Sequence, residues 1–289
     1  MFEIIALIIA LVGSSLAAWE DLRTTEIPDI IPHLMIACGL AINAAQSFLL
    51  WDYWPLLNSA IAGLSFLGFG FLMYRFGQWG GGDAKVLAAV GFLLPSFSAL
   101  PAGVSLLFPF PFSYLLNVFF VGAVYMILYA AVVAARNRKV VDEFVGSVRA
   151  SSRVVSIATL ALLAVFLIFG WYLSGAFGLQ IDSTFFVFNT LLPIGATVAL
   201  FVVWKFAKAV ENVGFKKRIS VRRLKVGDVL MSSKVWEGIT EKELRAIRRS
   251  DKRYVWIKEG VRFAPAFPLG LLFTIFFGDA VFVLLRFLA

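Results

Sequence analysis

The chain has 289 residues, of which 61% are hydrophobic and 15% are charged, with a formal net charge of +8. About 25% of the residues of a soluble domain are charged, so this composition excludes an ordinary soluble protein and indicates an integral membrane protein. The single cysteine, Cys38, and the single histidine, His33, exclude an internal disulfide and a thiolate zinc site, and they leave almost no material for a histidine metal site or a Ser-His triad.

Apolar runs of about 20 residues recur along the chain, and such a run can cross the hydrocarbon core as a helix. The first run lacks a basic start, so we expect a retained helix rather than a signal peptide. Four prolines interrupt the fourth run, so 95–112 is expected to form a short membrane-dipping or surface segment. We expect an all-α polytopic membrane protein with about eight transmembrane helices, at 2–19, 30–50, 56–76, 84–100, 113–135, 154–178, 185–208 and 266–288.

The basic residues indicate how these helices are oriented. With eight crossings, the loops on one side contain no Lys or Arg, whereas 25 of the 26 basic residues lie on the other side and only Arg286 lies outside it. The side without basic residues comprises loops 51–55, 95–112 and 176–184. Because basic loops stay in the cytoplasm, we expect a multi-pass protein of the plasma membrane with both termini extracellular and a cytoplasmic active site.

The one sizeable polar region, 210–264, is expected to fold into a small basic α+β domain in the cytoplasm. Residues 219–224 and 254–257 predict two strands, and a capping box at Thr240 predicts a helix to about Ser250. Its charge suits the anionic inner leaflet, although cations that merely set the topology are an equal alternative. The expected domains are a transmembrane catalytic domain at 1–209 with helices 1–7, this insert at 210–264 and a last transmembrane helix at 265–289.

Two acidic residues flank predicted helices on the cytoplasmic side. Asp21 follows the first helix, and Asp83 precedes the fourth helix after the run Gly80-Gly81-Gly82. Glycine lets another segment approach closely, at a cost in chain entropy that a purely structural loop avoids. Peptide hydrolysis needs one carboxylate to take a proton from water and one carboxyl to give a proton, and two adjacent carboxyls share one proton. The pair is therefore a candidate catalytic dyad.

Helix dipoles suggest how this pair shares its proton. Asp21 lies near a negative helix end, whereas Asp83 lies near a positive end and Lys85, so the hypothesis is that Asp83 is the carboxylate base and Asp21 the protonated partner. Each residue alone also has a simpler interpretation, Asp83 as a helix N-cap and Asp21 as an interfacial residue. Their joint occurrence on one side favours the dyad.

The segment Gly80-Gly81-Gly82-Asp83-Ala84-Lys85 contains the pattern Gly-x-Gly-Asp, and Asp21-Leu22-Arg23 is followed by Ile27-Pro28. Together these segments resemble the two aspartate motifs of the membrane aspartyl proteases that include prepilin and preflagellin peptidases. The first motif usually continues with Asn after the proline, where this chain has Asp29. Segments 225–230, 238–240 and 259–265 are similar to the archaeal branch of that family.

The resemblance implies that Asp21 and Asp83 are catalytic and that Gly80, Gly82 and Lys85 form an active-site loop. It implies an aspartic-type endopeptidase that removes short basic leaders, each followed by an apolar helix, from pilin or archaellin precursors with class III signal peptides. The bacterial branch carries paired Cys-x-x-Cys motifs and methylates its product. Because this chain lacks those cysteines, the resemblance implies no N-methyltransferase activity, no metal and no other cofactor.

A basic leader would be repelled by a basic insert, so nearby acids are candidates to receive it. Glu20, Glu26 and Asp29 flank Asp21 and are the predicted leader-binding residues, with solvated interfacial acids as the alternative. The expected partners are the precursors and membrane lipids, and not nucleic acid. Two other classes stay open: a proton-coupled transporter and a non-catalytic assembly scaffold. Against a transporter, both acids lie at one membrane face and the sequence has no inverted repeat.

Three other residues receive simpler interpretations. His33 is expected to be an interfacial or packed residue, and Cys38 a small hydrophobic residue of the core. Asp279 is an intramembrane acid, and we expect it near the outer interface, where it pairs with Arg286 or faces water.

Overall fold

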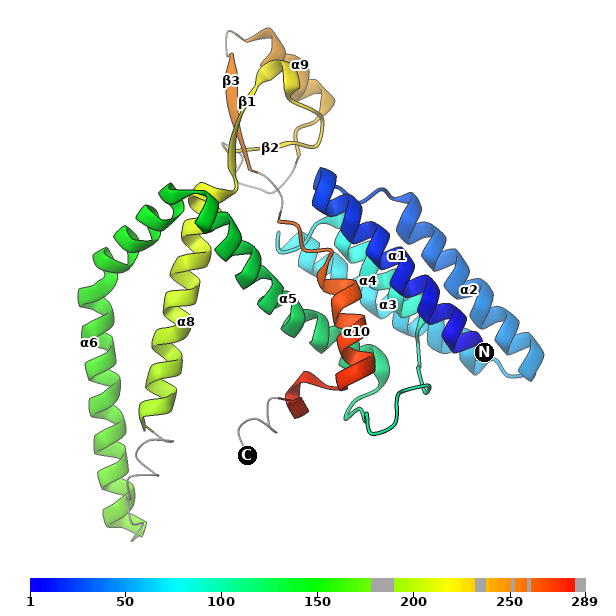
Figure 1. Ribbon diagram of the computed structural model, residues 1–289, viewed down its shortest axis with the longest axis horizontal. Coiled ribbons are helices and arrows are strands. Elements are labelled where there is room, and N and C mark those ends of the chain that lie inside the picture. Colours follow the sequence, from blue (N-terminus) through cyan, green and yellow to red (C-terminus); the bar gives the residue numbers. More distant parts are fainter. Residues whose placement is uncertain (178–189, 232–237, 251–252, 259–260, 284–289) are drawn as a thin grey trace. The chain divides into compact units, whose positions relative to one another are not determined.

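A computed structural model describes residues 1–177, 190–231, 238–250, 253–258 and 261–283 of the chain (Figure 1). Its contacts divide the chain into two compact units, residues 1–128 with 217–289, and residues 129–216. The main helices are α1 (Phe2–Thr24), α2 (Ile30–Leu50), α3 (Trp54–Arg75), α4 (Gly81–Leu93), α5 (Phe110–Arg136), α6 (Arg138–Phe177), α8 (Leu192–Ala209), α9 (Glu241–Arg249) and α10 (Ala266–Phe277). The strands are β1 (Lys216–Ser220), β2 (Val229–Leu230) and β3 (Tyr254–Lys258).

The protein is a polytopic membrane protein, as the sequence predicts. Each of the eight expected apolar helices has a counterpart, and six helices in the described residues are long and apolar enough to cross a membrane. The other two are shorter, since α4 has 13 residues and α10 has 12. At 1.5 Å per residue neither crosses about 30 Å of hydrocarbon by itself.

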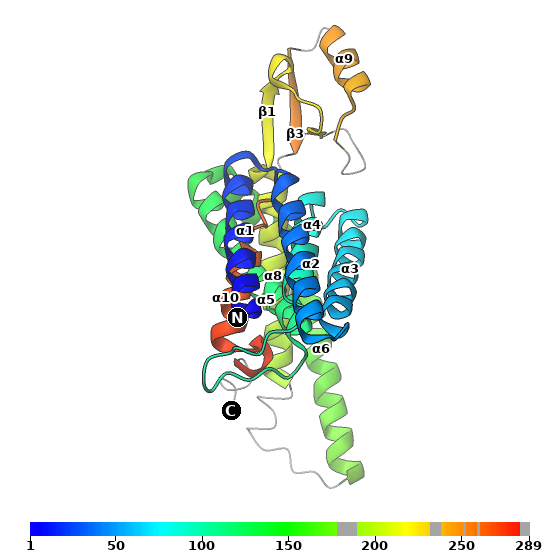
Figure 2. The same cartoon turned by 90° about the vertical axis from the view of Figure 1, so that its right-hand side faces the viewer.

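The short helix α4 forms the centre of the first unit, where it lies against α2 and α3 in two perpendicular views (Figures 1 and 2). Ten of its thirteen residues are buried. Glycines on the neighbouring helices permit the close approach, because a methyl group added at Gly39 of α2 or at Gly70 of α3 would lie 2.8 Å from the backbone of α4. A short helix is tolerated at membrane depth when protein surrounds it.

Several helix boundaries differ from the sequence-based expectation. Helix α4 ends at Leu93 rather than at residue 100, because Pro95 disfavours helical geometry at the residue before it. The expected loop 136–153 is instead the beginning of α6, a helix of 40 residues. The Asn137 side chain accepts a hydrogen bond from the Lys139 N–H at 3.2 Å, which caps the start of this helix.

The second unit has its own small core, which explains why α6 begins so early. Val140 at the start of α6 is buried against Ala209 and Val210, at the end of α8 and in the π-helical stretch that follows it. One turn later, the Phe144 ring meets Phe206 of α8 edge to face, with 5.5 Å between centroids. The polar residues between these positions occupy the other side of an amphipathic helix.

The polar insert folds largely as the sequence predicts. Its strands form a sheet in the order β1-β3-β2, in which β2 runs antiparallel to β3 and Leu230 pairs with Ile257. The Thr240 hydroxyl accepts from the Glu243 N–H, and the Glu243 carboxylate accepts from the Thr240 N–H, so the predicted capping box opens α9. The first strand is shifted, since β1 ends at Ser220 and residues 221–223 form a 3₁₀ turn.

The segment after α10 corrects the interpretation of Asp279. This residue is 1% exposed, and its carboxylate accepts a hydrogen bond from the Leu107 backbone N–H, so it does not face water. The expected helix 266–288 is interrupted, because α10 ends at Phe277 and Gly278 adopts a φ of 74° that only glycine favours. Its last residues and the expected pairing of Asp279 with Arg286 lie outside the described residues.

Candidate active site

Asp21 lies in the last turn of α1, three residues before the helix ends at Thr24. The next residue, Thr25, adopts the left-handed conformation with φ 61°, which turns the chain toward α2. The Asp21 side chain is 5% exposed, and its Oδ2 accepts a hydrogen bond from the Ala264 backbone N–H at 3.1 Å. A chain reversal thus places this acid inside the protein, against a segment 243 residues away.

Asp83 lies in the first turn of α4 and is 7% exposed. Its Oδ2 accepts a hydrogen bond from the Gly80 N–H at 3.0 Å, which is the helix-capping role that a Gly-rich turn suggests. Its Oδ1 is buried and has no hydrogen-bond partner among the described residues. A buried carboxyl oxygen without a donor is costly, so capping explains one oxygen of this carboxyl and leaves the other free for a substrate, a water or a proton.

The fold brings the two carboxyls to the same end of the first unit. Asp21 lies at the C-terminal end of α1 and Asp83 at the N-terminal end of α4, and these helices contact each other. The carboxyls are close enough for their charges to interact. Two neighbouring carboxyls that are both buried cannot easily both ionise, so this arrangement favours a shared proton.

The glycine loop is shaped by close contacts at two of its three glycines. A methyl group added at Gly82 would lie 2.8 Å from Cβ of Ile27, in the segment between α1 and α2, and one at Gly80 would lie 3.1 Å from Oδ2 of Asp83. A methyl group at Gly81 would meet nothing closer than the Tyr74 ring at 3.9 Å. Gly82 therefore lets the segment after Asp21 approach the loop that carries Asp83.

An ion pair joins the same two segments. Lys85 Nζ lies 2.6 Å from Oδ1 of Asp29, and the hydrogen bond and the charge of Lys85 lower the pKa of the Asp29 carboxyl. Asp29, one of the three acids predicted to bind a leader, is thus already paired. Glu20 is half-buried and Glu26 is exposed, and no ion pair involving either occurs among the described residues. Leader binding by all three acids stays a prediction.

Comparison with known proteins bears on what this pair of acids does. Residues 7–134 match the model of the type IV leader peptidase family. The matched segment contains both Asp21 and Asp83. The chain is therefore similar to the type IV leader peptidases over the segment that carries both acids, as its two motifs predict.

Individual relatives carry names of the same kind. The chain is 26% identical over 178 residues to prepilin peptidase EppA of Methanothermobacter thermautotrophicus, a match that covers 58% of this chain and 46% of the relative. It is 33% identical over 128 residues to a preflagellin peptidase of Methanococcus voltae, covering 43% of this chain and 54% of the relative. A preflagellin peptidase of Methanocaldococcus jannaschii is 31% identical over 91 residues, covering 32% and 38%. The matches thus span about half of these relatives or less.

The leader peptidase match ends at residue 134, and the sequence interpretation named no active-site residue beyond Lys85. The structure adds Ala264, whose amide binds Asp21, and the aromatic group around Trp79. The Trp79 ring packs against Phe69, Phe119, Phe263 and Phe267, with centroid distances of 5.5 to 6.0 Å. The run Phe263-Ala264-Pro265 lies in the segment whose sequence resembles the archaeal branch, so it could have been singled out from the sequence. The sequence gives no sign that Phe263 packs on Trp79.

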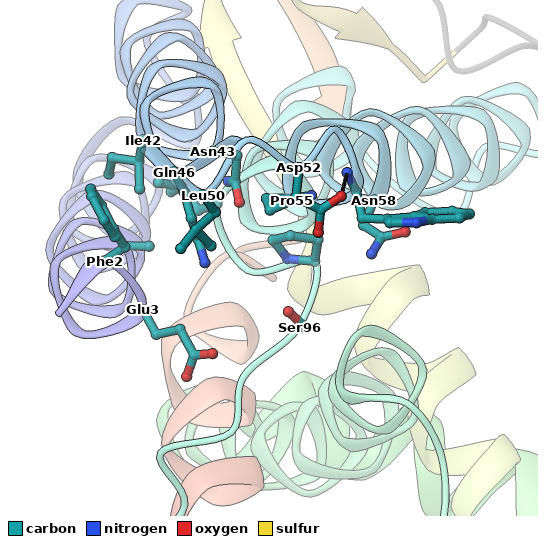
Figure 3. Close-up of a pocket in the computed structure, with 14 residues that line it drawn as sticks. Phe2, Glu3, Ile42, Asn43, Gln46, Leu50, Asp52, Pro55, Asn58 and Ser96 are labelled. Atoms are coloured by element: carbon teal, nitrogen blue, oxygen red, sulfur yellow. Dashed lines mark hydrogen bonds between the residues drawn. The ribbon is translucent and has the colours of Figure 1, made fainter. Parts of the chain in front are cut away.

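A cavity of about 250 Å³ lies at the opposite end of the first unit (Figure 3). Its polar lining includes Glu3 on α1, Asn43 on α2 and Asp52 just before α3. Glu3 precedes Asp21 by 18 residues of one helix, or roughly 27 Å at 1.5 Å per residue. This cavity is therefore separate from the candidate active site.

Proposed function

We propose that the protein is an aspartic endopeptidase that removes short basic leader peptides from pilin-like or archaellin-like precursors. One observation carries the proposal: Asp21 and Asp83 are two buried carboxyls from distant segments, each anchored through one oxygen by a backbone N–H. Such anchoring holds both side chains in defined positions and leaves Oδ1 of Asp83 without a partner among the described residues.

The chemistry needs these two groups in different protonation states. A carboxylate takes a proton from water, and the resulting nucleophile attacks the peptide carbonyl while the protonated carboxyl donates to the carbonyl oxygen or the leaving amine. The Ala264 N–H donates to Oδ2 of Asp21, and the Gly80 N–H donates to Oδ2 of Asp83. The two carboxyls differ at the other oxygen: Oδ1 of Asp83 is buried without a donor among the described residues, which disfavours its carboxylate form, and no buried, unpaired oxygen of Asp21 occurs there. We therefore assign the base to Asp21 and the resting proton to Asp83, the reverse of the helix-dipole hypothesis.

The proposed site of cleavage is the cytoplasmic edge of the membrane. The bias of Lys and Arg puts the ends of α1 and α4 on that side, where water reaches a scissile bond without crossing hydrocarbon. Val12, Leu16 and Trp19 form an exposed apolar stripe on α1, and this stripe leads to the last turn of the helix, which carries Asp21. The stripe suits the apolar helix of a precursor that arrives laterally. We propose that Glu20 and Glu26 then receive its basic leader.

The insert is proposed to face anionic lipid. Residues 216–262 contain 15 Lys or Arg and 6 Asp or Glu, so their net charge of +9 exceeds the net charge of +8 of the whole chain. On the exposed side of β3, Tyr254 and Trp256 are about half exposed, and the Arg218 guanidinium lies over the Tyr254 ring at 4.4 Å. Aromatic and basic residues favour the headgroup region of a bilayer, and lipid would also screen the insert from a basic leader.

The experiment is cleavage of a leader-bearing precursor by the purified protein in lipid. Asp21→Asn and Asp83→Asn should each abolish cleavage, whereas Asp142→Asn, at an exposed position of α6, should leave it unchanged. The product should carry an unmethylated N-terminus by mass spectrometry, and a chelator should not change the rate. Cleavage that survives either catalytic substitution would refute the proposal, and proton flux without proteolysis would favour the transporter.

A further inference from the structure

We propose that segment 261–267, which leads from the insert into α10, is a third part of the active site that positions Asp21 and connects it to the loop of Asp83. The inference rests on the proposed peptidase function. It concerns residues outside the segment 7–134 that matches the leader peptidase family. None of them is a catalytic residue in this proposal, because they act through the two carboxyls.

The first contact of this segment is made by a backbone amide. Ala264 is 0% exposed, and its N–H donates to Oδ2 of Asp21 at 3.1 Å. The Ala264 carbonyl accepts from the Phe267 N–H at 3.1 Å, which fixes the peptide orientation as α10 begins. A hydrogen bond to a buried carboxylate is stronger than one between neutral groups. The amide therefore both orients the Asp21 side chain and favours its charged form.

The second contribution is a positive charge. Arg262 is half-buried, and its guanidinium is close enough to Asp21 for the two charges to interact. Burial weakens the screening by water, so even a pair that is not in direct contact interacts appreciably. The charge acts in the same direction as the Ala264 amide, toward an ionised Asp21.

The third contact reaches the other catalytic segment. The Phe263 ring packs on Trp79 with 5.5 Å between centroids, and Phe267 meets the same indole edge to face at 5.8 Å. Trp79 immediately precedes Gly80, whose N–H binds Asp83. On the far side, a methyl group added at Gly122 would lie 2.8 Å from the Phe263 ring, so this phenyl group has little room to move. Displacing segment 261–267 would therefore disturb both carboxyls.

The first test removes the N–H of residue 264, although proline also adds two ring carbons at this fully buried position. In Ala264→Pro the donor is lost, and a proline suits this position because the residue before Pro265 already favours extended backbone. In the matched control, Ala264→Gly, the donor is kept. We expect kcat of the proline variant to fall on the order of 10-fold to 100-fold with KM nearly unchanged, and the acid limb of its pH profile to move to higher pH. Equal kcat and equal pH profiles in the two variants would overturn the proposal.

A second pair of variants keeps the proposal testable if Ala264→Pro does not fold. Arg262→Gln should move the acid limb of the pH profile to higher pH. Arg262→Lys should keep the limb where the wild type has it, because the positive charge of the side chain is required and its shape is not. Phe263→Leu, which keeps an apolar side chain, should lower kcat without moving the profile. If Arg262→Gln behaves like the wild type in rate and in pH profile, segment 261–267 does not position Asp21.

The outcome also separates this inference from the proposed function. Infrared titration of the Asp21 carboxyl, identified by its absence in Asp21→Asn, does not require proteolysis and should move to higher pH in Ala264→Pro and Arg262→Gln. A protein that shows this shift but cleaves no precursor would contradict the proposed peptidase alone. A protein whose cleavage depends on Asp21 and Asp83 but not on segment 261–267 would contradict the further inference alone.

Discussion

Asp29 and Lys85 form an ion pair with 2.6 Å between Oδ1 and Nζ, and it connects the segment after Asp21 with the helix that begins at Asp83. The pair lies eight residues beyond one catalytic candidate and two residues beyond the other. Position 29, where the resembling motif usually has Asn, therefore has a partner of its own in this chain. A leader that binds Asp29 either shares its carboxylate with Lys85 or displaces Lys85.

The first prediction concerns the effect of this pair on catalysis. Both side chains are partly exposed, so the pair contributes modestly, and Asp29→Asn or Lys85→Met should each lower kcat by up to about fivefold. The exchange Asp29→Lys with Lys85→Asp should recover most of the loss. Steady-state cleavage rates of the four proteins measure the coupling. Losses that simply add in the exchanged variant would mean that the two residues act independently.

The second prediction concerns the pH dependence of stability. Lys85 lowers the pKa of Asp29 below its ordinary value of 3.8, so the pair stabilises the fold fully above that value and loses its effect as pH falls through the lowered pKa. Asp29→Asn should therefore lower the unfolding temperature at pH 7. The difference from the wild type should shrink as the pH falls below 3.8 and through the lowered pKa. Thermal unfolding across this range checks the prediction, and a difference that does not vary with pH would contradict it.

The third prediction uses two neighbouring glycines of one loop. Gly82→Ala places a methyl group 2.8 Å from Cβ of Ile27 and should reduce cleavage at least about 10-fold, because it pushes the segments that carry Asp21 and Asp83 apart. Gly81→Ala is the matched control, since its nearest neighbour lies 3.9 Å away. Adding Ile27→Ala to Gly82→Ala should restore part of the activity. If Gly82→Ala and Gly81→Ala reduce cleavage equally, the loss comes from the conformational freedom of the glycines and not from the contact with Ile27.

The fourth prediction concerns the polar contact that holds α10 to α5. Asn117 is fully buried, donates to Thr274 Oγ1 at 2.9 Å and to the Gly278 carbonyl at 2.8 Å, and accepts from the Ala280 N–H at 2.9 Å. Asn117→Leu leaves these groups without their partner and should lower the free energy of unfolding by about 1–3 kcal/mol. Denaturation in detergent measures the loss. Thr274→Val removes only one of the three contacts, so it should cost less.

Local sequence was sufficient to predict which segments form helices and to identify Asp21 and Asp83 as candidate site residues. Apolar runs near 20 residues predicted each membrane helix because the bilayer imposes that length, and the Thr240-to-Glu243 capping box predicted α9 because its contacts lie within one turn. The start of α6, by contrast, depended on packing. The polar composition of residues 138–153 predicts a loop. In the structure they form a helix, because Val140 and Phe144 pack into a small core with α8.

The sequence by itself determined that the chain is a polytopic membrane protein with two acids, Asp21 and Asp83, in the motifs of a peptidase family, because hydrophobic length and short motifs are local properties. Only the tertiary structure decided what surrounds those acids. The Ala264 amide at Asp21, the Phe263 ring on Trp79 and the Lys85 ammonium at Asp29 come from segments up to 243 residues apart. No periodicity relates such positions, so the helix packing that brings them together had to be seen.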